Sequence, residues 1–168
     1  MYDAEAPGSI PTTVWDHLFP PDPPAVGSGA GGAVTATSFA AIPSGTGVVS
    51  ITNPSTVAAL LVDVRFGAWL TCTTQSDYIR ASVANNGGDV AVTGTPGGGG
   101  LTSWGQILHH ATAAGTIVAV TTKQHSSFTI QVPAGDTLSL QMVAMRNDAS
   151  ASVAAYYPFL ELLPLRYV

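Results

Sequence analysis

Apolar and polar residues alternate along much of this chain, most clearly in two segments of its second half. Ser127–Val132 and Leu138–Met142 each place an apolar residue at every second position. A period of two is typical of a strand with one buried face. Pro133–Asp136 lies between them and supplies a proline and a glycine suited to a turn. The two segments therefore predict an antiparallel hairpin.

The last stretch of the chain, Tyr156–Val168, is almost continuously apolar and carries charge only at Glu161 and Arg166. A chain terminus usually frays unless it is tied into a sheet. Strands with both faces covered read as near-continuous apolar runs. This stretch therefore predicts a strand that is central in its sheet and buried on both faces.

Two other segments carry strong strand patterns. Val57–Thr71 is the longest β-rich run, and Gly67 in its middle predicts a bulge or bend where one strand becomes two. Tyr78–Ala84 ends in Asn85–Gly88, whose Asn-Gly pair predicts a hairpin turn. Its expected partner is Asp89–Thr93. Weaker patterns predict strands at Ala33–Ala40, Val48–Thr52, Trp104–His110 and Thr116–Thr122.

No stretch of ten residues combines helical periodicity with strong helix formers. Turn signals recur about every ten residues, which is typical of a β-sandwich or barrel. The fold class predicted is all-β: an antiparallel β-sandwich, with the jelly roll fitting best by number of strands.

Residues 1–32 differ in composition from the rest, since they hold six of the twelve prolines and no basic residue. Such a composition favours extended chain. It predicts an extended Pro-rich N-terminal arm in which Gly27–Gly32 forms a flexible hinge. Residues 33–168 are then the sandwich domain.

Four apolar residues in this arm are spaced so that a single helical turn brings them together. They are the predicted partner-docking residues: Val14, Trp15, Leu18 and Phe19. Docking on a neighbouring subunit or on the protein's own sandwich would bury the aromatic pair, and burial stabilises each such side chain by roughly 1.5–3 kcal/mol. A disordered leader is the alternative.

Charged residues make up 9% of the chain and the net charge is −5, against a charged fraction of roughly 25% in a typical domain. The basic residues are scattered singly, which argues against a nucleic-acid partner. No apolar stretch reaches the length of about 18 residues that a membrane span needs, and the acidic N-terminus does not resemble a signal peptide. A single cysteine, Cys72, favours a buried thiol in a reducing compartment over a disulfide framework.

Residues that could carry chemistry do not form a recognisable set. Neighbours on a strand point to opposite faces, so His109 and His110 cannot chelate one metal. Asp63 and Arg65 share a face, as expected of a surface ion pair or a subunit contact. Gly97–Gly100 lacks the lysine and helix of a phosphate loop. No catalytic residue, metal ligand or cofactor is predicted; a hydrolase with two inward carboxylates is the weakest alternative.

Aromatic residues offer a further alternative, a carbohydrate-stacking platform on one sheet face. The candidates are Trp69, Trp104, Tyr156, Tyr157 and Tyr167. A place for most of them in the core or in a subunit interface is the favoured interpretation.

Several segments resemble small virion proteins of tailed bacteriophages, in particular minor tail proteins of phages of high-GC actinobacteria. They are Ile51–Ser55, Leu60–Trp69, Trp104–Leu108, the Val-Pro-Ala-Gly turn and the closing Tyr157–Val168. The resemblance spans roughly residues 47–168 and implies a jelly-roll module that is built into the particle without enzymatic activity. A trimer of the tumour-necrosis-factor-like kind is one form it could take. No functional residue of the family transfers.

The function expected is thus a non-enzymatic structural component of a tailed phage virion, assembled in the host cytoplasm. It would bind other virion proteins, tail or capsid subunits, and copies of itself through the arm and its charge-poor β faces. A capsid decoration protein is the first alternative. A receptor- or carbohydrate-binding module of the tail, with a host-surface glycan as ligand, is the second.

Overall fold

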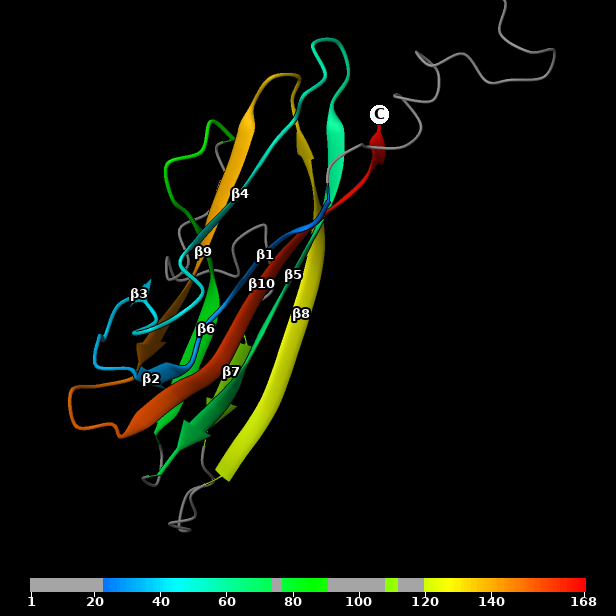
Figure 1. The fold of residues 1–168 in the computed structure, drawn as a ribbon. Helices are drawn as coiled ribbons and strands as arrows, with labels where there is room; N and C mark the ends of the chain where they lie inside the picture. Colours follow the sequence, from blue (N-terminus) through cyan, green and yellow to red (C-terminus); the bar gives the residue numbers. More distant parts are fainter. Residues whose placement is uncertain (1–22, 74–76, 91–107, 112–119) are drawn as a thin grey trace, which may run out of the picture.

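The computed structural model describes residues 23–73, 77–90, 108–111 and 120–168. These residues form ten strands and no helix, and hence no helix that could cross a membrane (Figure 1). The strands are β1 (Ala25–Ser28), β2 (Gly31–Ala33), β3 (Ala40–Ala41), β4 (Val48–Thr52), β5 (Leu60–Cys72), β6 (Tyr78–Asn85), β7 (Leu108–Ala111), β8 (Val120–Val132), β9 (Thr137–Arg146) and β10 (Val153–Tyr167).

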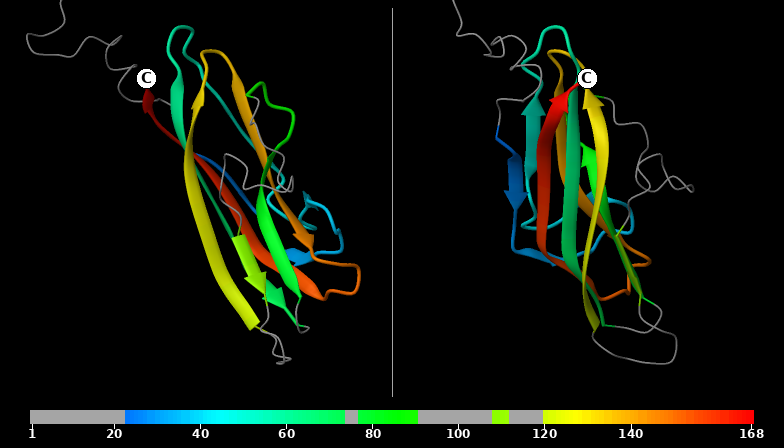
Figure 2. Two further views of the ribbon diagram at one scale, coloured as in Figure 1. Left: turned by 180° about the vertical axis from the view of Figure 1, so that it is seen from behind. Right: turned by 90° about the vertical axis from the view of Figure 1, so that its right-hand side faces the viewer.

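The strands form two antiparallel sheets that pack face to face (Figure 2). Sheet A has the order β1-β10-β5-β8, and β2 pairs with an earlier part of β10. Sheet B has the order β3-β9-β6-β7, and β4 also pairs with β9. If β1 with β2 and β3 with β4 are each taken as one interrupted strand, the chain has eight strands in jelly-roll order. The predicted fold class, an antiparallel jelly-roll sandwich, is confirmed.

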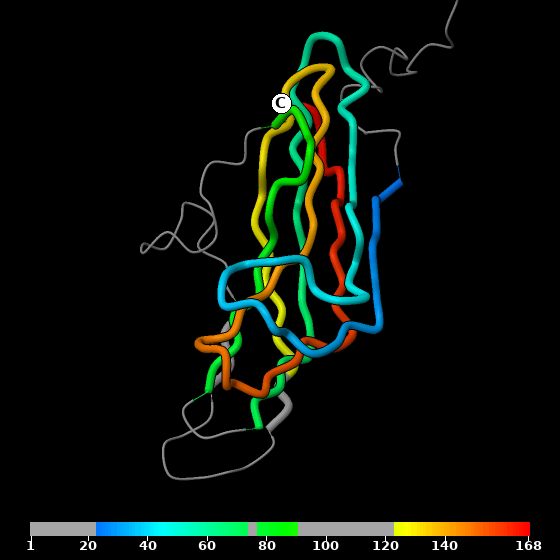
Figure 3. The backbone as a smooth tube through the Cα atoms, turned by 90° about the vertical axis from the view of Figure 1, so that its left-hand side faces the viewer, coloured from blue at the N-terminus to red at the C-terminus, as the bar shows by residue number. Residues whose placement is uncertain are grey.

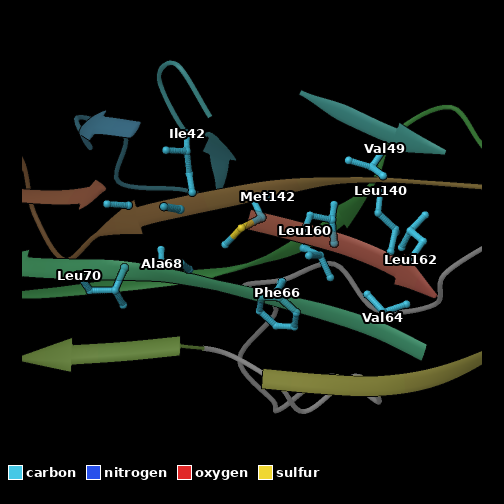
Figure 4. Close-up of a cluster of buried hydrophobic side chains, with 14 of the residues drawn as sticks. Ile42, Val49, Val64, Phe66, Ala68, Leu70, Leu140, Met142, Leu160 and Leu162 are labelled. Carbon is cyan, nitrogen blue, oxygen red and sulfur yellow. The ribbon is translucent and has the colours of Figure 1, made fainter. Parts of the chain in front are cut away.

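The core lies between the sheets and is made almost wholly of aliphatic side chains. Figure 4 shows Leu140 and Met142 of β9 meeting Leu160 of β10, with Phe66 of β5 beside them. All four are at most 1% exposed. Full burial of one such side chain stabilises the fold by roughly 1.5–3 kcal/mol. Burial of the alternating apolar residues therefore supplies the main driving force for folding.

The predicted hairpin of Ser127–Val132 with Leu138–Met142 is wrong. β8 pairs along its whole length with β5, whereas β9 pairs with β6, β4 and β3. The Pro133–Asp136 turn, closed by a hydrogen bond from Asp136 N to Pro133 O, therefore carries the chain from one sheet to the other. Alternation reports which face is buried, and strands facing each other across a core show the same alternation as neighbours in one sheet.

Two strand boundaries also differ from expectation. The predicted segments Thr116–Thr122 and Ser127–Val132 belong, over their described residues, to the single strand β8. β5 does not break at Gly67: it runs on to Cys72, and the irregularity lies in its neighbour β10. A Cβ on Gly67 would lie 2.5 Å from Cε1 of Phe159. The glycine makes room for that ring.

The last strand, β10, is central, as predicted, because it pairs with β5 on one side and with β1 and β2 on the other. Its predicted burial on both faces is wrong for the single chain. Leu160 and Leu162 are fully buried in the core, whereas Phe159 and Leu163 on the opposite face are half-exposed.

The predicted hairpin after Tyr78–Ala84 is not formed by the described residues. The backbone N–H groups of Asp89 and Val90 donate to Thr137 O at the start of β9, so this segment follows β9 instead of returning along β6. Of the predicted strand Ala33–Ala40, the two end residues alone are in strands, β2 and β3.

The glycine-rich segment Gly27–Gly32 is not a free hinge, because most of it is paired with β10. A Cβ on Gly29 would lie 2.2 Å from Ser44 O, and Gly31 N donates a hydrogen bond of 3.0 Å to the same carbonyl. Figure 3 shows the segment between β2 and β4 passing across this side of the sandwich. Glycine lets the backbone of this segment approach the Ser44–Gly45 backbone closely. This contact closes one edge of the sandwich.

We expect Gly29→Ala to destabilise the fold by about 1–3 kcal/mol, since the added methyl group overlaps the Ser44–Gly45 backbone. Gly32→Ala is the matched control: its Cβ would meet nothing closer than 3.7 Å, so we expect no loss of stability. Urea unfolding of both variants measures this. If neither substitution lowers the free energy of unfolding, the segment is a flexible hinge.

Asn53 directly follows β4, which has the bounds predicted for the strand Val48–Thr52. Its side chain is fully buried. The amide Nδ2 donates to the carbonyl oxygens of Ala58, Val132 and Pro133 at 2.8–3.0 Å, and Oδ1 accepts from Ser55 N. Asn53 thereby ties the start of β5 to the turn between β8 and β9.

We expect Asn53→Ala to lower the free energy of unfolding by about 2–4 kcal/mol, because buried carbonyl groups lose their donor. Asn86→Ala removes a single exposed hydrogen bond to Gln141 and should change stability by less than about 0.5 kcal/mol. Chemical denaturation compares the two. Similar small losses would show that Asn53 does not hold the turn.

Candidate functional site

Exposed apolar side chains gather on the outer face of sheet A, the face turned away from sheet B. Within the part of the chain that the structure describes, these exposed residues on strands of sheet A are Val26, Trp69, Tyr156, Tyr157 and Leu165. Val26 lies opposite Glu161 in the middle of β10, and the other four lie toward the two ends of that strand. Such clustering on one face typically marks a contact surface.

The first group, here called the aromatic platform, consists of Trp69, Tyr156 and Tyr157, with exposed fractions of 44%, 42% and 67%. Trp69 of β5 and Tyr156 of β10 are direct cross-strand partners. The rings of Trp69 and Tyr157 meet edge to face, with centroids 6.4 Å apart and planes at 79°. The platform lies near the start of β10, at the lower end of the sandwich in Figure 1.

A β-bulge produces the position of Tyr157. The pairs Tyr156–Trp69 and Phe159–Gly67 enclose two residues on β10 but one on β5. Tyr157 occupies the position of the extra residue. Its φ of 49° lies in the left-handed region. This conformation costs roughly 1–3 kcal/mol for a non-glycine residue.

Hydrogen bonds from the β1–β2 turn hold the bulge in place. Tyr157 N donates to Ala30 O and Gly29 N donates to Pro158 O, each at 3.1 Å. The Tyr157 side chain remains largely exposed, so burial of its ring does not offset the backbone strain. The bulge is thus a built feature that presents a ring to the solvent.

The second group, here called the apolar end, consists of the exposed Leu165 and, after the strand, Val168, together with the half-buried Leu61 and Leu163. Leu165 lies at a second register shift of β10, between Pro164 and Arg166, and is 40% exposed. Val168 and Ala59 exchange two backbone hydrogen bonds of 2.8 and 3.2 Å. The backbone of Val168 is therefore held by that of Ala59, while its apolar side chain is half-exposed.

A small ionic cluster lies between the two groups. Arg65 Nε donates to Asp63 Oδ2 at 2.7 Å, and Arg65 Nη1 lies 3.7 Å from Glu161 Oε2. The predicted same-face pairing of Asp63 with Arg65 is confirmed. Exposed ion pairs of this kind contribute roughly 0.2–1 kcal/mol to stability. The main consequence of the cluster is that charged residues lie between the two apolar groups.

The predicted docking residues Val14, Trp15, Leu18 and Phe19 lie outside the described residues, as does Trp104. The structure does fix where the chain before β1 leaves the sandwich. β1 is antiparallel to β10 and Ala25 pairs with Leu162, so the start of β1 points toward the apolar end. Among the other predicted aromatic candidates, Tyr167 packs against the core.

The histidines do not form a metal site with other described residues. His109 and His110 lie on β7, where they pair with Arg80 and Ile79 of β6. His125 is exposed on β8. No group of three or more histidine, cysteine or acidic residues close enough to hold a metal occurs in the described ranges.

Cys72 is fully buried at the end of β5. Burial raises the pKa of its thiol to about 11, with a smaller contribution of the same sign from Asp77. A thiol of this kind is a poor nucleophile at neutral pH, in keeping with the role of a small core residue.

Reading of the sequence missed both bulges of β10, although a signal for them was present. Pro158 and Pro164 lie inside the strand, and proline in a sheet is confined to edges and irregular positions. Each register shift adjoins one of these prolines. The two prolines thus marked the places where β10 turns apolar side chains outward.

Comparison with known proteins adds little. No protein-family model and no curated protein sequence matches the chain. Among solved structures it is similar to the Eiger TNF from S. frugiperda, with a TM-score of 0.44 and 12% sequence identity over 88% of this chain and 96% of that one. At this level the likeness carries no argument about function.

Proposed function

We propose that this protein is a non-enzymatic structural component of a tailed phage virion, of the minor tail protein type. It assembles through the apolar end of sheet A and the N-terminal segment that leaves the sandwich beside it. The observation that supports this proposal is the exposure of Leu165 on β10 and of Val168 directly after it, beside the half-buried Leu163.

The argument rests on the two faces of β10. A strand with apolar residues on both faces is ordinarily covered on both, yet the single chain covers one. With 9% charged residues overall, the chain has few charges to keep an apolar face in water. Contact with another protein subunit removes that face from solvent, and such burial is favourable.

The partner surface is formed by copies of the same chain and by neighbouring virion proteins. In each chain, β1 begins next to the chain's own apolar end, because Ala25 pairs with Leu162. A segment carrying Val14, Trp15, Leu18 and Phe19 can then reach the adjacent subunit. A closed oligomer, such as a trimer, covers every apolar end equally.

The particle itself tests the assignment. Mass spectrometry of gradient-purified phage particles should find this chain at a fixed ratio to the other tail proteins. Gold labelling with an antibody against the chain should mark the tail, whereas label on the head would favour a capsid decoration protein. Recovery of the chain from the unassembled fraction alone would contradict a structural role.

Assembly through the apolar end predicts a specific effect of charge. Leu165→Lys places an ammonium group in the proposed contact, so we expect self-association to weaken at least about tenfold. Folding should be preserved, because substitutions at exposed positions change stability by about 0.5 kcal/mol or less. Size-exclusion chromatography with light scattering measures the oligomer.

Val48→Lys is the matched control, since Val48 is 50% exposed but lies on β4 in sheet B. It should leave the oligomer intact. If Leu165→Lys and Val48→Lys assemble equally well, the apolar end is not the contact.

A further inference from the structure

We propose that the aromatic platform is a binding site for an acidic saccharide, a pyranose chain that carries carboxylate groups. This site goes beyond the assembly role and uses residues at the other end of sheet A. The juxtaposition that carries it is a strained, exposed Tyr157 against Trp69, with Lys123 on the next strand.

The ring arrangement suits a sugar. A pyranose has a flat face of C–H groups bordered by hydroxyls, and an exposed indole or phenol ring offers a flat apolar surface with a polar atom at its rim. Trp69 and Tyr156 stand side by side across two strands, while Tyr157 meets the indole at 79°. One ring can stack with the sugar while the other bounds it laterally.

The backbone strain indicates that the position of Tyr157 is used. Its φ of 49° is unfavourable for a bulky side chain. The hydrogen bonds from Tyr157 N to Ala30 O and from Gly29 N to Pro158 O hold the bulge in this conformation. Strained residues of this type cluster at ligand sites. The ring is 67% exposed, so burial of the ring does not account for the arrangement.

The local charge selects an acidic ligand. Lys123 is the direct cross-strand partner of Trp69 and is exposed. Among the described residues no carboxylate forms an ion pair with it. The outer-face positions from Gly67 to Thr71, their partners on β8 and β10, and the residues of β1 and β2 that pair with this part of β10 include no acid. In a chain of net charge −5, this is a local cationic site.

A second copy of the chain fits the platform less well. An isologous contact places the same patch against itself. Two Lys123 ammonium groups would then share one surface that has no carboxylate of its own, and like charges across a contact oppose binding. An acidic saccharide supplies the missing charge.

Two acidic oligosaccharides are suitable probes, a hyaluronan hexasaccharide and an oligogalacturonate of equal length, with maltohexaose as the neutral control. Isothermal titration at low ionic strength should show saturable binding of at least one acidic probe and much weaker binding of maltohexaose. Added salt should weaken the acidic interaction.

Variants locate the site on the platform. Trp69→Ala should weaken binding roughly tenfold or more. Tyr157→Asn removes the ring but tolerates the left-handed φ, so it should lose affinity without lowering the thermal midpoint. Lys123→Gln should abolish the preference for acidic over neutral sugar. Tyr78→Ala, which removes an aromatic ring from β6 in sheet B, should bind like the unmodified chain.

The outcomes that overturn the site are distinct from those that overturn assembly. Lack of binding by both acidic probes, equal binding of maltohexaose, or equal binding of poly-glutamate refutes an acidic-saccharide site. An oligomer that dissociates in Trp69→Ala, with no sugar bound, makes the platform a contact between copies. Leu165→Lys should keep saccharide binding even where it loses assembly.

Discussion

The interaction on which the structure depends is the packing of β10 and β5 against β9. Leu160 and Leu162 meet Leu140 and Met142 across the core, and this contact fixes which residues of β10 point inward. Successive residues of a strand point to opposite faces, so the same register turns Phe159 and Leu163 outward. The apolar outer face of sheet A is thus a direct consequence of a strand that is apolar at nearly every position.

The two bulges divide that outer face into two surfaces. Each adds a residue to β10 beside a proline, and each turns an apolar side chain toward the solvent, Tyr157 at one end and Leu165 at the other. The Asp63–Arg65–Glu161 cluster lies between them. Glu161 interrupts the outer row of β10, so the apolar residues do not form one continuous stripe, which would carry a risk of non-specific association. The bulged strand offers an aromatic, cationic end and an aliphatic end, and we propose a different partner for each.

Fold class, the central place of β10, the end of β4 at Asn53 and the Asp63–Arg65 pair could be predicted from the sequence, because alternation and turn chemistry are local signals. Strand partners could not: the Pro133–Asp136 turn has the composition of a hairpin but joins two sheets. Composition also failed at Gly27–Gly32, since glycine permits both flexibility and close packing. The platform was named as an alternative, but the bulge that exposes it depends on how β1, β2 and β10 meet.

The central claim is that the two ends of sheet A's outer face have different occupants. Hydroxyl-radical footprinting of the free chain, the assembled particle, and the particle with an acidic oligosaccharide measures this residue by residue. The account predicts that Leu165 loses reactivity on assembly, while Trp69 and Tyr157 stay reactive until the sugar is added. Protection of all three on assembly alone, or of none in either state, would contradict it.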